Sequence, residues 1–121
     1  MEQRHPLSGL RVLEMGSRTT APYIGKLFTD AGADVLKLES PVGDPFRTWS
    51  ASGASIPDGE DAAWWRFLNA GKKSTTIDLE TDEGKVQFHN LVTETDLILD
   101  DHIPQDAQRL GITYEDIHIT S

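Results

Sequence analysis

Short apolar stretches alternate along this chain with segments that carry apolar residues at helical spacing. The stretches that predict buried strands are residues 10–15, 34–39, 74–79 and 97–99. Helices are predicted at 21–31, 62–68, 82–93, 105–110 and 114–119. Strands that alternate with helices favour an α/β fold, a Rossmann-like and mostly parallel sheet flanked by helices on both faces.

The junction after the first predicted strand is the strongest candidate for a ligand site. Gly16 can adopt a tight turn, Thr19 or Thr20 can cap the following helix, and Pro22 suits a first helical position. The start of a helix offers unpaired backbone N–H groups and the positive end of the helix dipole. We therefore expect a phosphate to bind there.

The region 41–61 is rich in glycine, proline, serine and aspartate and predicts a long loop. Loops of this length are uncommon in compact domains and are often functional. This loop is therefore a candidate lid or partner contact.

Composition narrows the possible partners. The 121 residues fit a single domain spanning 1–121, and their formal net charge of -9 argues against nucleic acid or an anionic membrane. The absence of cysteine excludes disulfides and thiolate chemistry. No apolar run resembles a signal peptide or a membrane span, so we expect a cytoplasmic protein.

Two other kinds of site are represented by incomplete motifs, and the motif of a third is missing. Gly16 with Glu39 imitates a dinucleotide site but lacks the further glycines of that motif. Asp100, Asp101 and His102 could ligate a metal, yet neighbours on a strand point to opposite faces, so we expect no metal. The G-x-S-x-G motif of hydrolases is absent.

Five segments, in this order, resemble the family III CoA-transferases, which include formyl-CoA transferase and the carnitine CoA-transferases. They are PLSGLRVLEMG, APYIGKLFTDAGADVLKLESP, GDPFRTW, FLNAGKKSTTIDLETDEGK and DLILDDHIPQDAQRLGITYEDI, which cover nearly the whole chain. The resemblance implies the N-terminal part of a Rossmann-like large domain, in a longer protein that forms an interlocked homodimer. It implies acyl-CoA and a carboxylic acid acceptor as substrates.

The resemblance also implies the positions that contact coenzyme A. Matched residue by residue, they are Thr19, Thr20, Leu68, Asn69, Lys72, Lys73, Asp101, His102 and Arg109. Lys72 and Lys73 form the one adjacent basic pair in the sequence, and CoA phosphates need such donors in an acidic chain. As an isolated feature, the same pair is typical of solvated surface.

The chain departs from the family pattern at several of these positions. Asp101 and His102 stand where the family usually has an asparagine and an aromatic residue, and Gln105 replaces a glycine. A carboxylate beside a polyphosphate is repulsive, which weakens CoA binding unless that carboxylate faces away.

In the family, an aspartate later in the sequence forms an aspartyl-CoA intermediate, and no residue of this chain matches it. We therefore expect the isolated chain to be inactive and assign it no catalytic residue. Two alternatives remain open. The domain can be a degenerate interaction module, or part of a related 2-methylacyl-CoA racemase, whose acid and base residues also lie beyond this length.

Overall fold

The computed structural model describes residues 5–16 and 18–120, with the side chains of 119 and 120 left out of the description. Its elements are β1 (Arg11–Met15), α1 (Thr20–Asp30), β2 (Asp34–Glu39), the 3-10 turn η1 (Pro45–Arg47), α2 (Ala63–Asn69), β3 (Lys73–Thr76), α3 (Asp82–Thr93), β4 (Leu97–Asp100), α4 (Pro104–Leu110) and α5 (Tyr114–Thr120).

In the described part of the chain, the sheet has four strands in the order β3-β2-β1-β4, and all neighbouring strands are parallel. The α/β prediction is confirmed. The chain moves outward from β1 to β2 and β3, and then returns to place β4 on the other side of β1. The order of strands therefore reverses between β1 and β4, and ligands of open α/β sheets bind in the crevice at such a point.

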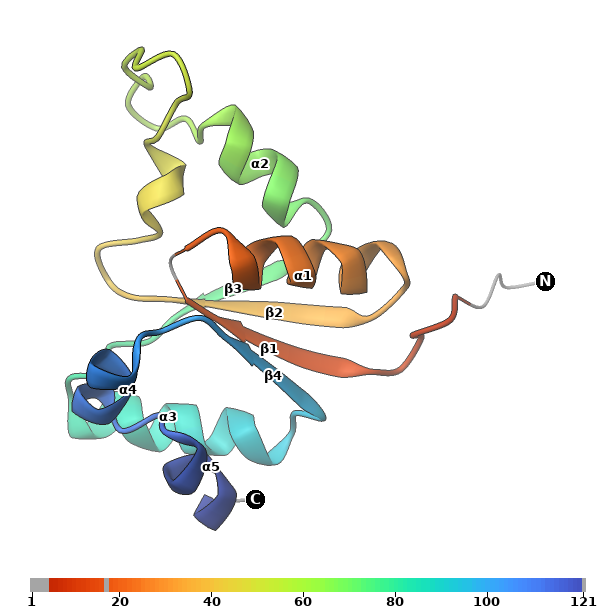
Figure 1. Ribbon diagram of the computed structural model, residues 1–121, viewed down its shortest axis with the longest axis vertical. Helices are drawn as coiled ribbons and strands as arrows, with labels where there is room; N and C mark the ends of the chain where they lie inside the picture. The colour runs from red at the N-terminus through yellow and green to blue at the C-terminus, as the bar shows by residue number, and fades with distance from the viewer. Residues whose placement is uncertain (1–4, 17, 121) are drawn as a thin grey trace.

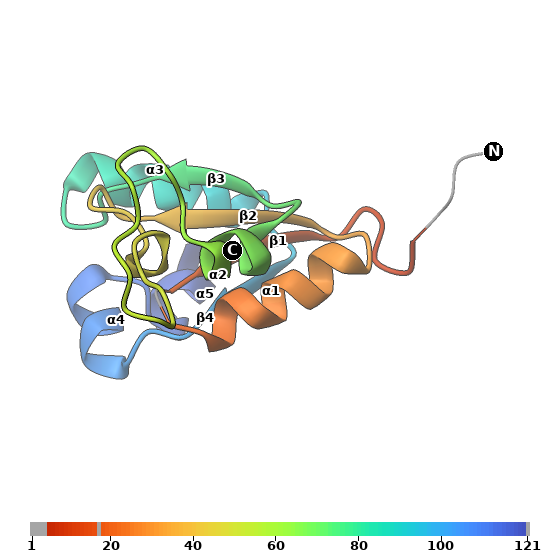
Figure 2. The ribbon, with the colours of Figure 1, turned by 90° about the horizontal axis from the view of Figure 1, so that it is seen from above.

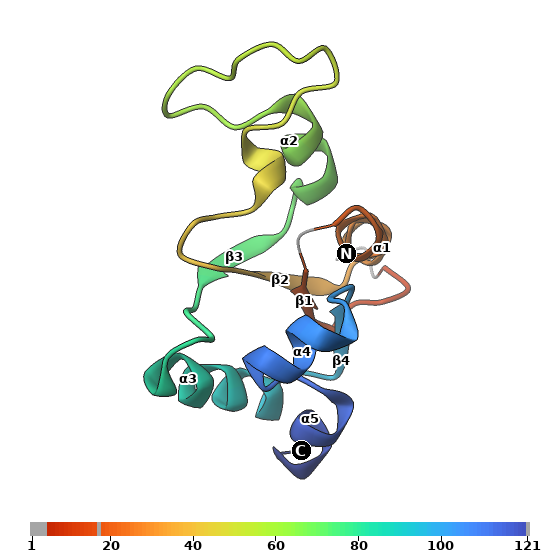
Figure 3. The same ribbon diagram turned by 60° about the vertical axis from the view of Figure 1, so that its left-hand side comes forward.

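Helices cover both faces of the sheet (Figures 1 and 3). α1 and α2 lie side by side over one face (Figure 2), and α3, α4 and α5 lie on the other. The main core lies on the α3 side and contains the buried residues Leu13, Met15, Leu38, Ile77, Leu79, Phe88, Val92, Ala107 and Ile112. A smaller core on the α1 side contains Val12, Ala33 and Val35.

Several local predictions are confirmed and others are wrong. The Thr81 hydroxyl caps α3 by accepting a hydrogen bond from the Gly84 N–H at 2.9 Å. β3 ends at Thr76, short of the predicted end at residue 79, although Ile77 and Leu79 are still buried in the main core. Apolar residues therefore continue past the last ladder pair, which periodicity alone does not reveal.

The first part of the long loop is held in place by specific contacts. Asp44 caps η1, its carboxylate accepting a hydrogen bond from the Phe46 N–H at 2.8 Å. Arg47 pairs with Glu39 and with Asp61, both at 2.8 Å, which joins the two ends of the loop. The base of the predicted lid is therefore fixed. Among the described residues, no helix is long and apolar enough to cross a membrane.

Candidate functional site

A pocket of about 470 Å³ opens at the carboxyl ends of the strands. The loops that follow all four strands contribute to it. Its lining residues are Gly16, Leu38, Glu39, Ser40, Pro41, Val42, Gly43, Asp44, Ile77, Asp78, Leu79, Glu80, His102, Asp106, Arg109 and Leu110. Side chains of the main core form an apolar wall of the pocket, and charged side chains surround its opening. This combination is typical of small-molecule sites.

Two of the predicted CoA contacts, His102 and Arg109, line this pocket. Arg109 lies in the last turn of α4 and pairs with Glu80, which follows β3, and with Asp106 at 3.9 Å. The Arg109 and Glu80 side chains are more than half exposed, so their ion pair contributes little to stability and can exchange its partner for a ligand.

His102 carries a second positive charge at the pocket when it is protonated. Its Nδ1 lies 2.6 Å from Asp100 Oδ1, and this hydrogen bond raises the pKa of the His102 imidazole above its ordinary value. Helix α4 and the segment after β4 therefore bring two basic side chains, His102 and Arg109, to one side of the pocket, each paired with a carboxylate.

The start of α1 differs from the sequence prediction. The helix begins at Thr20, so Pro22 is its third residue and not its first. Thr19 occupies the capping position but makes no side-chain hydrogen bond to the helix. The capping group comes from after β4, because Asp101 Oδ2 accepts a hydrogen bond from the Ala21 N–H at 3.1 Å. The predicted threonine cap is therefore wrong.

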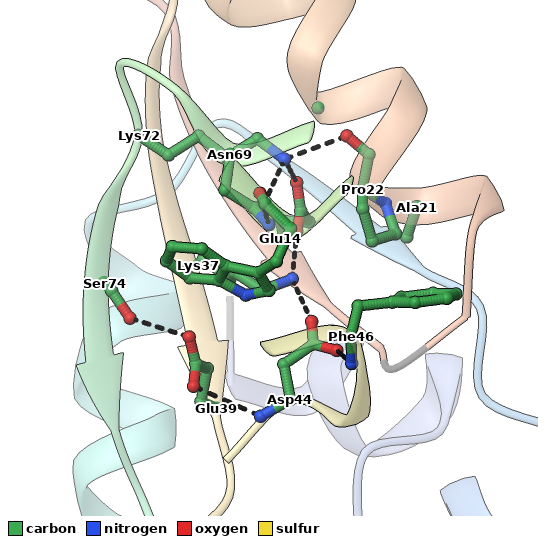
Figure 4. A network of polar contacts seen from close by, with 12 residues as sticks. Glu14, Ala21, Pro22, Lys37, Glu39, Asp44, Phe46, Asn69, Lys72 and Ser74 are labelled. Carbon is green, nitrogen blue, oxygen red and sulfur yellow. Dashed lines mark hydrogen bonds and ion pairs between the residues drawn. The ribbon is translucent and has the colours of Figure 1, made fainter. Parts of the chain in front are cut away.

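A buried polar network lies beneath α1 (Figure 4). The side chains of Glu14 and Lys37 are 0% and 1% exposed and pair at 2.9 Å across neighbouring strands. Lys37 also pairs with Asp44 at 2.9 Å. Burial by itself lowers the pKa of Lys37, but the two carboxylates outweigh it and hold that pKa above its ordinary value.

Lys72 belongs to this network and does not line the pocket. Its side chain is 1% exposed, and its ammonium group donates to the Glu14 carboxylate, to the Pro22 carbonyl at 2.8 Å and to Asn69 Oδ1 at 2.9 Å. Burial lowers the pKa of Lys72 below its ordinary value. All three of its donor positions have protein acceptors, so Lys72 joins α1, α2 and the sheet.

Lys73 points away from its neighbour. It begins β3 at the amino edge of the sheet, opposite the pocket, and its side chain is 75% exposed at 3.7 Å from Asp34. The structure therefore separates the two lysines that the sequence presents as a pair. Leu68 and Asn69 are buried at the end of α2, on the face covered by α1.

Glu39, the carboxylate that a dinucleotide site would use to bind a ribose, already has partners within the protein. Its two oxygens accept hydrogen bonds from Arg47 at 2.8 and 2.9 Å, from the Asp44 N–H at 3.3 Å and from the Ser74 hydroxyl at 3.2 Å. Burial favours the neutral acid, but Arg47 outweighs it and lowers the pKa of Glu39. This carboxylate fixes the loop and has little capacity left for a ribose.

Sequence reasoning missed the buried charges Glu14, Lys37 and Asp44. A signal for two of them was present. Glu14 and Lys37 each stand two residues after a buried valine, Val12 and Val35, and so share the inward face of their strands. Among the described residues, no group of three or more histidine and carboxylate side chains is arranged to hold a metal ion.

Comparison with known proteins gives a consistent match. Residues 7–119 match CoA-transferase family III. The chain is 40% identical over 117 residues to the succinyl-CoA–D-citramalate CoA-transferase of Chloroflexus aurantiacus, covering 93% of this chain and 27% of that protein. It is 34% identical over 120 residues to the succinate–glutarate CoA-transferase of Agrobacterium fabrum, covering 97% of this chain and 30% of that one.

A solved structure shares the fold. The crystal structure of a CAIB/BAIF family protein from Brucella suis aligns with a TM-score of 0.87 at 34% identity, covering 98% of this chain and 32% of that one. This chain thus spans about 30% of the length of the relatives it matches.

Proposed function

Since this chain belongs to CoA-transferase family III, we propose that its residues 1–121 form a CoA-binding domain, the N-terminal part of a longer enzyme. That enzyme would transfer CoA between carboxylic acids and act as an interlocked homodimer. The observation that carries the proposal is the pocket at the carboxyl edge, to which the loops after all four strands contribute. Ligands of open α/β sheets bind at this edge.

The pocket offers groups suited to the nucleotide end of CoA. Arg109 can form paired hydrogen bonds to a phosphate through its planar guanidinium, and a protonated His102 adds charge beside it. The apolar wall that includes Ile77 and Leu110 suits an uncharged planar group such as adenine. In this proposal, Lys72 positions the start of α1 and does not itself contact a phosphate.

The transfer chemistry is assigned to an aspartate outside these 121 residues. That aspartate would attack the acyl-CoA thioester to form a mixed anhydride and release CoA thiolate. The thiolate would then attack the aspartyl carbonyl, forming an aspartyl-CoA thioester and expelling the donor carboxylate. The acceptor carboxylate would repeat the two steps in reverse, which yields the new acyl-CoA and frees the aspartate. The acids near the pocket are engaged locally. Asp100 binds His102, Asp101 caps α1, and Asp78 accepts a hydrogen bond from the Glu80 N–H at 3.0 Å.

The two transferases named above act on succinate or its CoA thioester, so succinyl-CoA is the first donor to test with the full-length enzyme.

An interaction module is the second candidate, and the acidic lining of the pocket favours it. Five carboxylate residues, Glu39, Asp44, Asp78, Glu80 and Asp106, line the pocket against His102 and Arg109. This excess of carboxylates repels an anion unless the anion lies closer to His102 and Arg109 than to the acids. Binding of CoA to this chain separates the two candidates, because a module that has lost the site would not bind it.

Arg109→Ala is expected to weaken CoA binding by roughly 10- to 100-fold, the loss that follows from removing a charged hydrogen bond to phosphate. Isothermal titration calorimetry with CoA measures the change. Arg11→Ala is the matched control, since Arg11 is also exposed and paired with a carboxylate, Asp96, but lies at the opposite edge of the sheet. If both variants lost the same amount of CoA affinity, the effect would come from the net charge of the domain and not from a contact with Arg109.

A further inference from the structure

The first turn of α1 lies at the point where the strand order reverses, between the carboxyl ends of β1 and β4. The helix dipole favours a negative charge there, and the Ala21 N–H can donate to one. Pro22 has no N–H, and the Tyr23 N–H donates to the Thr19 carbonyl at 3.0 Å. The turn contains no acidic residue of its own, and Thr19 makes no capping bond. The negative group that reaches it belongs to Asp101, which accepts from the Ala21 N–H at 3.1 Å.

The Asp101 carboxylate is closely seated against the turn after β1. Gly16 has φ +137°, and a Cβ atom at that position would lie 1.8 Å from Asp101 Oδ1. The Asp101 N–H also donates to the Met15 carbonyl at 3.4 Å. Oδ1 itself is buried and has no hydrogen-bond partner in the described part of the chain. The carboxylate therefore fills the space between the Gly16 turn and the start of the helix.

We propose that Asp101 is a specificity-determining residue whose carboxylate occupies the anion position at the start of α1 and keeps phosphate groups out of it. A phosphate placed there would meet a like charge at van der Waals distance and would find the Ala21 N–H already bonded. This inference rests on the proposed function. If Asp101 closes the start of α1, the CoA phosphates bind on the Arg109 side of the pocket, away from α1.

Asp101→Asn tests the charge with little change in shape. Without ligand, the amide oxygen can still accept from the Ala21 N–H, so α1 keeps its cap. The neutral side chain does not repel an incoming anion, so pyrophosphate can displace it and take over both the N–H and the space. The probe is inorganic pyrophosphate at constant ionic strength, followed through the NMR amide signals of Ala21 and Tyr23. Up to about 10 mM, the wild-type signals should stay in place, and the variant should bind at least roughly tenfold more tightly.

Asp100→Asn is the matched control. It removes the same charge from the neighbouring residue, whose carboxylate bonds to His102 and not to α1. The Ala21 and Tyr23 signals of this variant should respond to pyrophosphate as those of the wild type do, because Asp100 supports the charge of His102 at the pocket and not the start of α1. Asp101→Ser is a second neutral variant, used if Asp101→Asn fails to fold, and it should gain the same response.

Two results would overturn the inference. One is a shift of the wild-type Ala21 signal as large as that in the Asp101 variants. The other is an equal gain in Asp100→Asn, which would point to a general effect of net charge. Because pyrophosphate is not CoA, these outcomes are independent of the calorimetric test of the proposed function, and either idea can fail alone.

Discussion

Replacing Lys72 with alanine is expected to lower the free energy of unfolding by about 3–5 kcal/mol, the range for breaking a buried ion pair from one side. The change leaves the buried Glu14 carboxylate with Lys37 alone and removes the donor to the Pro22 carbonyl and to Asn69. Urea unfolding followed by circular dichroism measures the loss.

Lys73→Ala is the matched control for this prediction. The Lys73 side chain is 75% exposed, so its loss should change stability by less than about 0.5 kcal/mol. Lys72→Met, which keeps most of the apolar volume, should recover part of the stability lost in Lys72→Ala. If Lys72→Ala were as stable as Lys73→Ala but bound CoA more weakly, Lys72 would be a phosphate ligand and the structural role would be wrong.

Gly16→Ala is expected to lower the free energy of unfolding by about 2–4 kcal/mol, the sum of backbone strain and the loss of a helix cap. Gly16 has φ +137°, a conformation that residues with a side chain rarely adopt. The new methyl group would also collide with the Asp101 carboxylate and push it away from the Ala21 N–H. The same denaturation experiment gives the loss.

Two variants separate strain from collision. Gly9→Ala has a similarly unfavourable φ of +89° but open space around its Cβ position, so it should cost about 1–2 kcal/mol from strain alone. In an Asp101→Ala background the collision disappears, and Gly16→Ala should then cost about as much as Gly9→Ala. Strictly additive losses at Gly16 and Asp101 would show that the two residues do not contact each other.

The order and type of the elements could be predicted because they depend on local patterns. Apolar strands separated by helical repeats specify a parallel α/β sheet, and the TDEGK segment that opens α3 carries its own cap in Thr81. The ends of elements were less predictable, as β3 shows, since a buried residue such as Leu79 can follow a strand without belonging to it.

The candidate site depends on contacts between distant segments, which no local pattern contains. Asp101 caps a helix that begins 81 residues earlier, at Thr20, and replaces the threonine that local rules favour. Lys72 and Lys73 have the same chemistry in the sequence, but the turn into β3 buries one and exposes the other. His102 and Arg109, in contrast, follow one strand closely, and the fold brings both to the pocket.

The most direct test of the account is a map of the CoA site on this chain by NMR. Titration with CoA should shift the amide signals of Gly43, His102 and Arg109 around the pocket, and should leave those of Arg11 and Lys73 at the opposite edge in place. A folded chain that shows no shifts at about millimolar CoA, or shifts centred on Lys73, would contradict the proposal that this pocket binds CoA.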